Sequence, residues 1–239
     1  MTKISKLFKL LPYKLFRDAV LSCGVAPVIE HTKILQGLNC KTVVDIGANK
    51  GQFALVSRYC FPHANIVSFE PLPRPAKIFN TVFKNDKNTV LNNVAIGPKE
   101  EKTLIHISKS DDSSSLLPIS DLQEKIYPGT SEVGVATIDV APLDCFLTMK
   151  DINSPALLKL DVQGFELDAL RGCESLLSSF DSIYCECSFV ELYSGQKMAS
   201  DIIAWLYKRG FTLKGAYNMS YDDKGLAIQA DFMFMNNLK

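Results

Sequence analysis

The architecture of this chain is set by residues 43–53, which read Val-Val-Asp-Ile-Gly-Ala-Asn-Lys-Gly-Gln-Phe. A β-branched run ends in an acid, two glycines follow, and the residues after Gly51 are typical of a helix start. Gly47 lets the chain reverse without a Cβ clash. Gly51 is expected to keep the loop surface bare, so that a ligand can lie against the peptide. The segment therefore predicts a strand, a ligand-binding turn and a helix.

A second strand also ends in an acid, at Ile66-Val67-Ser68-Phe69-Glu70-Pro71. Its spacing from the first is that of a carboxylate that accepts hydrogen bonds from a ribose diol. The third glycine of a dinucleotide site is missing, and Asp45 at the turn would repel a pyrophosphate but suit an amine-bearing ligand. The pattern favours S-adenosylmethionine over NAD. The alternative is structural: Asp45 caps the turn and Glu70 is a solvated strand end.

Composition is that of an intracellular enzyme of 239 residues with 47% hydrophobic residues, enough for a substantial core. Lys+Arg and Asp+Glu both number 26, so net charge gives no reason to expect nucleic acid as a partner. The seven cysteines lie mostly in apolar runs without a C-x-x-C pair, which predicts reduced, buried thiols in a cytoplasmic protein.

Residues 1–40 are expected to form an N-terminal helical extension. Basic residues interleave with apolar ones up to Pro12 and beyond, namely Lys3, Lys6, Lys9, Lys14 and Arg17. Two interpretations remain open. The segment is either a helix that packs its apolar face on the domain, or a peripheral anchor at an anionic membrane surface. The sequence contains no signal peptide or membrane-spanning run.

Residues 41–239 alternate strand and helix patterns, which predicts an α/β domain with helices on both faces of the sheet. The fold expected is a seven-stranded, mostly parallel sheet whose last strand is antiparallel, because a polar hairpin loop precedes it. Strands are predicted at 42–46, 65–70, 89–96, 156–161, 182–187, 211–217 and 227–235, and helices at 52–59, 74–84, 165–177 and 198–209.

An insertion at about 98–155 interrupts this alternation and carries the cluster Ser113-Ser114-Ser115-Leu116. Long insertions of this kind are often lids or substrate walls. The apolar residues on either side favour an ordered segment, with a further strand at 133–140, over a disordered excursion.

A second group of acids follows the buried strand Leu157-Leu158-Lys159-Leu160. Asp161 stands at the end of this strand, and Glu166 lies in the first turn of the next helix. Glu186 lies in the following strand among small and apolar residues. Such carboxylates can remove a proton from a hydroxyl or hold a hard cation. The alternative is that Asp161 caps the Gly164 turn and Glu166 its own helix.

These segments together resemble the FkbM-type S-adenosylmethionine-dependent methyltransferases. The resemblance rests on residues 45–51, 69–71, 93–97, 113–116, 137–139 and 159–166, in this order. The last of these is the most specific, although the family typically has Glu where this chain has Gln163. The match runs from about Thr42 to about Asn236, so nothing carries over to the N-terminal segment.

The resemblance implies a Rossmann-like class I methyltransferase fold and transfer of a methyl group to a hydroxyl of a sugar, glycan or natural product. By position, Asp45, Gly47, Asn49 and Gly51 would shape the methionine end of the cofactor pocket, and Glu70 would hold the ribose. Asn93 and Val94 would lie by the adenine, and Ser115 would be a lid contact. Asp161 and Glu166 would face the methyl group and the acceptor.

For the chemistry we predict Asp161 as the general base, with Glu166 and Glu186 as the next candidates. No metal site is predicted. A divalent cation, if one binds, is expected to be magnesium-like and held by oxygens of Asp161 and Glu186. Two other functions stay open: a catalytically inactive module that binds a cofactor or nucleotide sugar, and an NAD-dependent sugar oxidoreductase.

Overall fold

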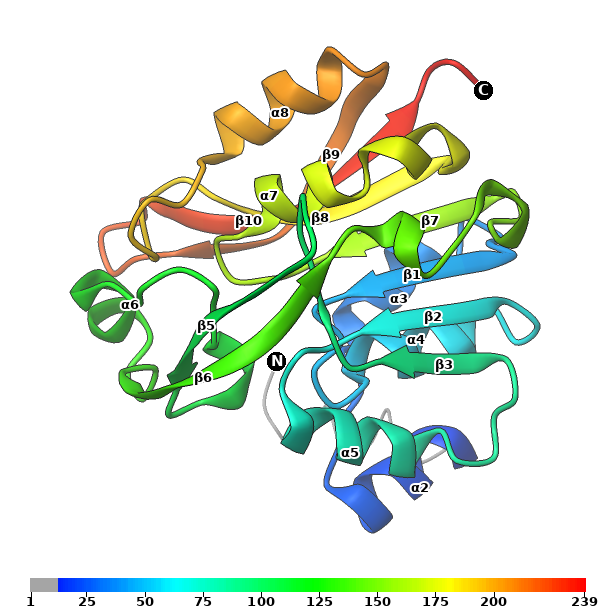
Figure 1. Ribbon diagram of the computed structural model, residues 1–239, viewed down its shortest axis with the longest axis horizontal. Helices are drawn as coiled ribbons and strands as arrows, with labels where there is room; N and C mark the ends of the chain where they lie inside the picture. The colour runs from blue at the N-terminus through cyan, green and yellow to red at the C-terminus, as the bar shows by residue number, and fades with distance from the viewer. Residues whose placement is uncertain (1–12) are drawn as a thin grey trace.

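The structure, a computed structural model, describes residues 13–239, and in this part of the chain a seven-stranded sheet forms the centre (Figure 1). The strand order across the sheet is β3-β2-β1-β7-β8-β10-β9. The strands are Thr42–Ile46 (β1), Asn65–Phe69 (β2), Thr89–Asn92 (β3), Ala156–Leu160 (β7), Ser182–Ser188 (β8), Phe211–Tyr221 (β9) and Ala227–Asn236 (β10).

Strand directions confirm the predicted fold class. β1 pairs in parallel with β2 on one side and β7 on the other, whereas β10 runs antiparallel to β8 and β9. The chain reverses before β10 because Asp222 Oδ1 accepts hydrogen bonds from the backbone amides of Lys224 and Leu226. The order of the strands changes direction between β1 and β7, which is where open α/β sheets bind ligands.

Helices cover both faces of the sheet (Figure 1). One face packs on α7 and α8, and the other on α4 and its neighbours, as the two main hydrophobic clusters show. All residues of β1 and β7 are buried, as expected of parallel strands between two helical layers. The helices are Gln52–Cys60 (α4), Pro73–Val82 (α5), Glu166–Gly172 (α7) and Ala199–Tyr207 (α8).

The described part of the N-terminal segment packs into the same core. It forms α2 (Lys14–Cys23), the 3-10 turn η1 (Ile29–His31) and α3 (Thr32–Leu35). Phe16 and Ala19 are buried in a cluster with residues of α4 and α5. Lys3, Lys6 and Lys9 lie outside the described residues, so membrane contact through the basic segment stays a prediction. Among residues 13–239 there is no helix of the length and apolarity needed to span a bilayer.

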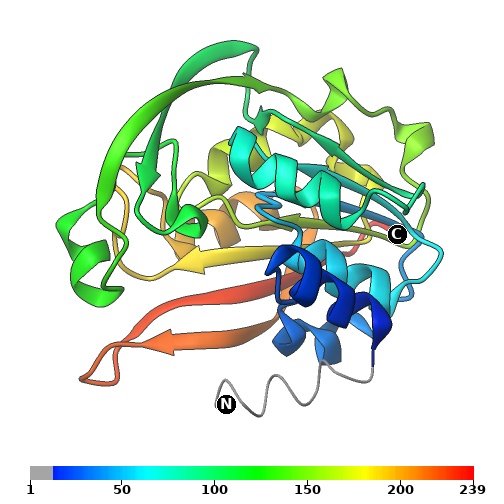
Figure 2. The same ribbon diagram turned by 90° about the horizontal axis from the view of Figure 1, so that it is seen from below.

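The insertion is ordered, and its strands β5 and β6 join β4, just before it, in a second sheet of three strands with the order β4-β6-β5, which arches past the carboxyl end of the main sheet (Figure 2). The strands of this sheet are Ala95–Ile96 (β4), Glu101–Ser108 (β5) and Glu132–Ala141 (β6). The helical turns of the insertion are Asp111–Ser113 (η2), Asp121–Ile126 (α6), Leu143–Cys145 (η3) and Met149–Asp151 (η4).

Two predicted elements are divided. The strand expected at 89–96 is two strands in different sheets, because β3 pairs with β2 while β4 pairs with β6. Asn93 makes the bend between them, with its Nδ2 donating to the carbonyls of Glu70 and Pro71. The helix expected at 165–177 ends at Gly172 and continues as a 3-10 helix, Glu174–Ser179 (η5).

The prediction about cysteines is only partly correct. All seven are free, but Cys145 is exposed and Cys23 and Cys60 are partly exposed. Cys40, Cys173, Cys185 and Cys187 are the buried ones. In η3 the neighbouring Leu143 is buried while Cys145 is exposed, so the apolar residues around Cys145 did not indicate that it is buried.

Candidate active site

A cavity of about 210 Å³ opens at the carboxyl ends of β1, β2 and β7 and beneath the insertion. Its apolar part is lined by side chains of β2, β4 and β5 and the segments next to them, including Phe69, Leu72, Val94, Ile96 and Ile105. Its polar part is lined by Asn49, Glu70, Lys159, Asp161 and Gln163. The site therefore joins an apolar wall to a cluster of charged and amide groups.

Glu70 follows β2 and is fixed by backbone donors on both carboxylate oxygens. The amide of Asn49 donates to Oε2 at 3.0 Å, and the amide of Leu72 donates to Oε1 at 2.8 Å. Burial raises the pKa of Glu70 to about 7, against the effect of these two hydrogen bonds. Each oxygen keeps a second lone pair, so the carboxylate can still accept from a ligand hydroxyl at this edge of the cavity.

Gly47 and Gly51, the two glycines of the first turn, are required for different structural reasons. A Cβ on Gly47 would lie 1.9 Å from the carbonyl oxygen of Asp161, so glycine lets the ends of β1 and β7 approach. A Cβ on Gly51 would lie 2.7 Å from the ring of Phe83 and 3.0 Å from that of Phe79. Gly51 does not line the cavity, so its place in the sequence is explained by packing on α5.

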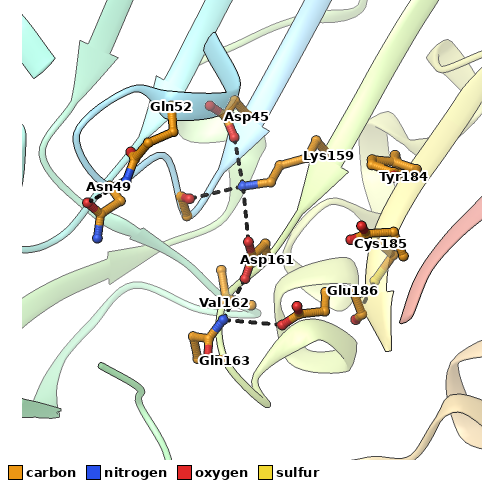
Figure 3. A network of polar contacts seen from close by, with 12 residues as sticks. Asp45, Asn49, Gln52, Lys159, Asp161, Val162, Gln163, Tyr184, Cys185 and Glu186 are labelled. Carbon is orange, nitrogen blue, oxygen red and sulfur yellow. Dashed lines mark hydrogen bonds and ion pairs between the residues drawn. The ribbon is translucent and has the colours of Figure 1, made fainter. Parts of the chain in front are cut away.

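Asp45 and Lys159 form a buried ion pair beneath the cavity (Figure 3). Lys159 Nζ lies 3.1 Å from Asp45 Oδ1 and 3.8 Å from Asp161 Oδ2, and it donates to the carbonyl of Gly47 at 3.0 Å. Burial lowers the pKa of Lys159, but Asp45 and Asp161 outweigh burial, so the pKa is raised overall. Burial raises the pKa of Asp45, and Lys159 opposes that rise.

Neither carboxylate oxygen of Asp45 has an aligned hydrogen-bond donor among the described residues. The Lys159 ammonium is thus the main group that offsets the free-energy cost of burying the Asp45 carboxylate. Lys159 in turn links the end of β1 to Asp161, so Asp45 acts on the site through Lys159 and does not line the cavity itself.

Gln163 is the centre of the loop after β7. Its Nε2 donates to Asp161 Oδ1 at 2.7 Å and to Glu186 Oε2 at 3.2 Å, and its Oε1 accepts from the Tyr193 hydroxyl at 2.6 Å (Figure 3 shows the two carboxylates). Its backbone has φ of 56°, a left-handed conformation that is uncommon for glutamine. These contacts hold the strained residue in place, and strain of this kind clusters at functional sites.

Ser115 connects the insertion to the loop after β7 by a hydrogen bond. Its Oγ donates to the backbone carbonyl of Gln163 at 2.6 Å, and its side chain is buried. Lys50, in the first glycine turn, forms a 3.1 Å ion pair with Asp111 of η2. The insertion is therefore attached to both loops that border the cavity.

The other two predicted acids lie behind the cavity wall. Glu166 is 2% exposed, and its Oε1 accepts from the amides of Val162 and Gly164 at 3.1 and 3.0 Å. Burial raises its pKa to about 7. Burial, together with the charges of Asp161 and Asp231, raises the pKa of Glu186 well above its ordinary value.

The structure thus divides the predicted site residues into two groups. Those that line the cavity are Gly47, Asn49, Glu70, Val94, Ser115 and Asp161. Those that do not are Asp45, Gly51, Asn93, Glu166 and Glu186. The second group supports the loops and the ion pair that shape the first.

The sequence matches the Methyltransferase FkbM domain over residues 45–213, which is more than half of the 239-residue chain. This chain belongs to the FkbM methyltransferase family. The matched range contains every one of the predicted site residues, including Glu70 and Asp161, the two predicted acids that line the cavity.

Two relatives of this FkbM chain are themselves methyltransferases by name. The 2-O-methyltransferase NoeI of Sinorhizobium fredii is 29% identical over 160 residues, which are 64% of this chain and 66% of NoeI. Methyltransferase 1 of Beauveria bassiana is 26% identical over 147 residues, 55% of this chain and 58% of the relative. The match therefore spans less than two thirds of the length of either relative.

Among solved structures, the O-methyltransferase from Bacillus cereus in complex with SAH is similar at 13% identity with a TM-score of 0.49. The alignment covers 99% of this chain and 93% of that one. At this distance the similarity adds nothing about the chemistry of the FkbM chain, which rests on its own geometry.

His31 is a cavity residue that the sequence analysis missed. It lies in η1, lines the cavity with Tyr184 and Asp231, and its Nδ1 is 3.0 Å from the Tyr184 hydroxyl. Burial lowers the pKa of His31, although Asp231 opposes this effect. No local pattern marks this histidine, because its neighbours in space come from β8 and β10.

The geometry also tests whether a divalent cation can bind at this site, which the sequence did not decide. Between Asp161 and Glu186, the two oxygen ligands suggested for it, lies the amide nitrogen of Gln163. Among residues 13–239 no group of three or more His, Cys, Asp or Glu side chains is arranged to hold a metal ion. The structure therefore gives no support for a divalent cation at this site.

Proposed function

We propose that this protein is an S-adenosylmethionine-dependent O-methyltransferase that acts on a hydroxyl of a small molecule or glycan. The observation that carries the proposal is that one cavity brings together Glu70 and Asp161, two acids with separate surroundings. Glu70 lies beside the apolar wall, and Asp161 lies at the strand-order switch point beside Lys159 and Gln163. The name of NoeI, a 2-O-methyltransferase, supports oxygen as the atom methylated.

The residues present fit the cofactor. Val94, Ile96 and Ile105 offer an apolar surface suited to an adenine ring, and Glu70 next to them offers acceptors for a ribose diol. Asn49 and the backbone at Gly47 lie toward the acidic end, where an α-amine and a sulfonium are electrostatically favoured. When bound, S-adenosylmethionine supplies a methyl carbon that is electrophilic enough to react with an aligned oxygen.

The part left to the protein is to align the acceptor and remove its proton. Asp161 is the candidate base, because its side chain is 39% exposed and borders the cavity. Gln163 Nε2 and the Lys159 ammonium fix the direction of this carboxylate. Asp161 would accept the proton of the acceptor hydroxyl as its oxygen takes the methyl group that bound S-adenosylmethionine would supply.

Calorimetry on the full chain tests the cofactor site. Glu70→Ala removes the acceptors for the ribose diol and is expected to weaken S-adenosylmethionine binding by about 2–3 kcal/mol. Glu100→Ala, at an exposed position in the insertion, is the matched control and should bind as the wild type does. If Glu70→Ala binds S-adenosylmethionine with the affinity of the wild type, Glu70 does not bind the ribose.

A thermal-shift panel separates this function from its two rivals, since a ligand that binds only the folded state raises the midpoint. S-adenosylmethionine and S-adenosylhomocysteine should raise it and NAD should not. A shift with NAD alone would favour the sugar oxidoreductase. A shift with both sulfur ligands but no methyl transfer to any acceptor would favour the inactive binding module.

A further inference from the structure

We propose that His31 binds the α-carboxylate of S-adenosylmethionine and takes up a proton as the cofactor binds. The inference rests on the proposed function and adds to it a binding residue and a linked protonation. His31 lies outside the range 45–213 that matches the FkbM domain, and so does Asp231, the acid beside it. The assignment therefore comes from the fold of this chain, in which η1 and β10 meet at the cavity.

The order of the strands places His31 at one end of the cavity. Glu70 follows β2, the first glycine turn follows β1 and Asp161 follows β7, and these strands are successive neighbours in the sheet. β8 and β10 come next, and they carry Tyr184 and Asp231, which lie beside His31. With the ribose assigned to Glu70 and the reacting methyl group to Asp161, this end of the cavity is left for the amino-acid part of the cofactor.

An α-carboxylate at this end needs a cationic partner, and the lining offers few. Among the described residues that line the cavity, only Lys159 and His31 can carry a positive charge. The three N–H groups of the Lys159 ammonium are engaged. They face Asp45 Oδ1 at 3.1 Å, the Gly47 carbonyl at 3.0 Å and Asp161 Oδ2 at 3.8 Å. His31 is therefore the group left to meet a ligand anion.

The imidazole of His31 has one nitrogen engaged and the other open. Nδ1 lies 3.0 Å from the Tyr184 hydroxyl and 3.3 Å from Asn218 Nδ2. The ring packs edge to face with Phe53 and with Tyr184, at centroid distances of 5.6 Å in both pairs. Nε2 has no hydrogen-bond partner among the described residues, and it is not one of their buried unpaired atoms, so it keeps accessible surface. The contacts thus fix the ring and leave Nε2 to a ligand.

The groups around His31 favour a neutral ring in the protein alone. Burial lowers the pKa of His31 below the ordinary value of 6.5, and the charge of Lys159 on β7 adds to this effect. Asp231 on β10, Glu30 in η1 and Asp161 after β7 oppose the decrease in pKa but do not reverse it. The ring is therefore mostly uncharged at pH 7.5.

A carboxylate at Nε2 changes this balance. Its negative charge at hydrogen-bond distance favours the imidazolium, so the ring takes a proton from solution as the carboxylate binds. Tyr184 on β8 adds no competing charge, because burial raises the pKa of its phenol above the ordinary value. Cofactor binding should therefore be linked to proton uptake, and the uptake at His31 should require the carboxylate.

The test is calorimetry on full-length protein at pH 7.5, in HEPES and in Tris, whose different ionisation enthalpies report the protons exchanged on binding. The ligands are S-adenosylhomocysteine and its decarboxylated analogue, which keeps the amine and lacks only the carboxylate. S-adenosylhomocysteine should take up about 0.3 proton or more beyond the analogue, and it should bind about tenfold more tightly. Protons exchanged at Glu70 cancel in this comparison, because both ligands carry the ribose.

His31→Asn should remove the difference between the two ligands. Its amide occupies the place of Nδ1 beside Tyr184 but offers nothing at the place of Nε2, so affinity and proton uptake should become similar for both. The matched control is His63→Asn, at an exposed position after α4, which should distinguish the ligands as the wild type does. Thermal unfolding should show both variants folded.

The comparison of the two ligands on the wild type does not depend on either variant. The inference is overturned if the wild type takes up no more protons with S-adenosylhomocysteine than with the analogue. It is also overturned if His31→Asn distinguishes the ligands as the wild type does. Both outcomes leave the proposed function intact, whereas a wild type that binds neither ligand would overturn the proposed function and this inference with it.

Discussion

Three carboxyl groups around the loop after β7 look alike in sequence but have different surroundings. Asp161 is partly exposed and borders the cavity, whereas Glu166 is enclosed by backbone amides and Glu186 is held by the amides of Gln163 and Gln229. A proton acceptor has to reach its substrate and be ionised. Only Asp161 of the three borders a cavity, and we propose positioning roles for the other two.

Asp161→Asn should abolish methyl transfer and leave cofactor binding intact. The amide keeps the shape of the side chain but cannot take the acceptor proton, which typically lowers the rate by about 100- to 10,000-fold. Single-turnover methylation, with S-adenosylmethionine binding measured in parallel by calorimetry, checks this. Wild-type turnover in the variant would refute the role, and lost binding would assign Asp161 to the cofactor pocket instead.

Lys159→Met should destabilise the fold by about 3–5 kcal/mol, because it leaves the carboxyl of Asp45 buried without its ion partner. Lys102→Met is a matched control, since Lys102 and Asp139 are also 3.1 Å apart but lie on the surface. That variant should change the free energy of unfolding by less than about 1 kcal/mol. Urea unfolding of both variants measures the difference, and equal losses would contradict the importance of burial.

At the scale of elements, the site depends on how closely the ends of β1 and β7 approach. Gly47→Ala would place a Cβ 1.9 Å from the Asp161 carbonyl oxygen, so the two strand ends must separate. We expect weaker cofactor binding and a loss of about 2 kcal/mol or more in stability beyond the backbone cost, because a packed interior accommodates added atoms poorly.

The matched control for this substitution is Gly225→Ala in the β9–β10 loop. Gly225 has the same φ of 81° as Gly47, but no heavy atom lies within 4 Å of its added Cβ. This variant should lose only the cost of a left-handed alanine, about 1–2 kcal/mol. If the two variants unfold at the same urea concentration, then the close approach of the Asp161 carbonyl oxygen is not the reason for glycine at position 47.

At the scale of the whole molecule, Glu166 should make stability depend on pH. Its pKa rises from 4.5 to about 7 on folding, so the folded state binds the extra proton between these values. The contribution of Glu166 to the free energy of unfolding is therefore fully present at low pH. It is lost as the pH rises through 7, and the total loss is about 3 kcal/mol.

Glu166→Gln should remove this part of the pH dependence. The amide oxygen can still accept from Val162 and Gly164, and the side chain no longer titrates. Urea unfolding at pH 5, 6, 7 and 8 gives the free energy of unfolding of the wild type and of the variant, and the change of their difference with pH is the contribution of Glu166. A difference that stays constant over this range would show that Glu166 does not titrate with a raised pKa.

The sequence by itself determined the sheet, and six of the eleven site residues predicted from it border the cavity. Strands and turns are local patterns: β-branched runs, glycines at a reversal and acids at strand ends are visible one segment at a time. That is why the parallel order, the antiparallel β10 and the acids Glu70 and Asp161 were predicted in place.

Only the tertiary structure decided which polar groups meet and which are buried. His31, Tyr184 and Asp231 come from an N-terminal turn and two distant strands, and they meet only in the folded protein. The roles of Glu166 and Glu186 likewise depend on the backbone and amide groups that enclose them. Burial, hydrogen-bond satisfaction and pKa are properties of three-dimensional surroundings, so no single segment of sequence contains them.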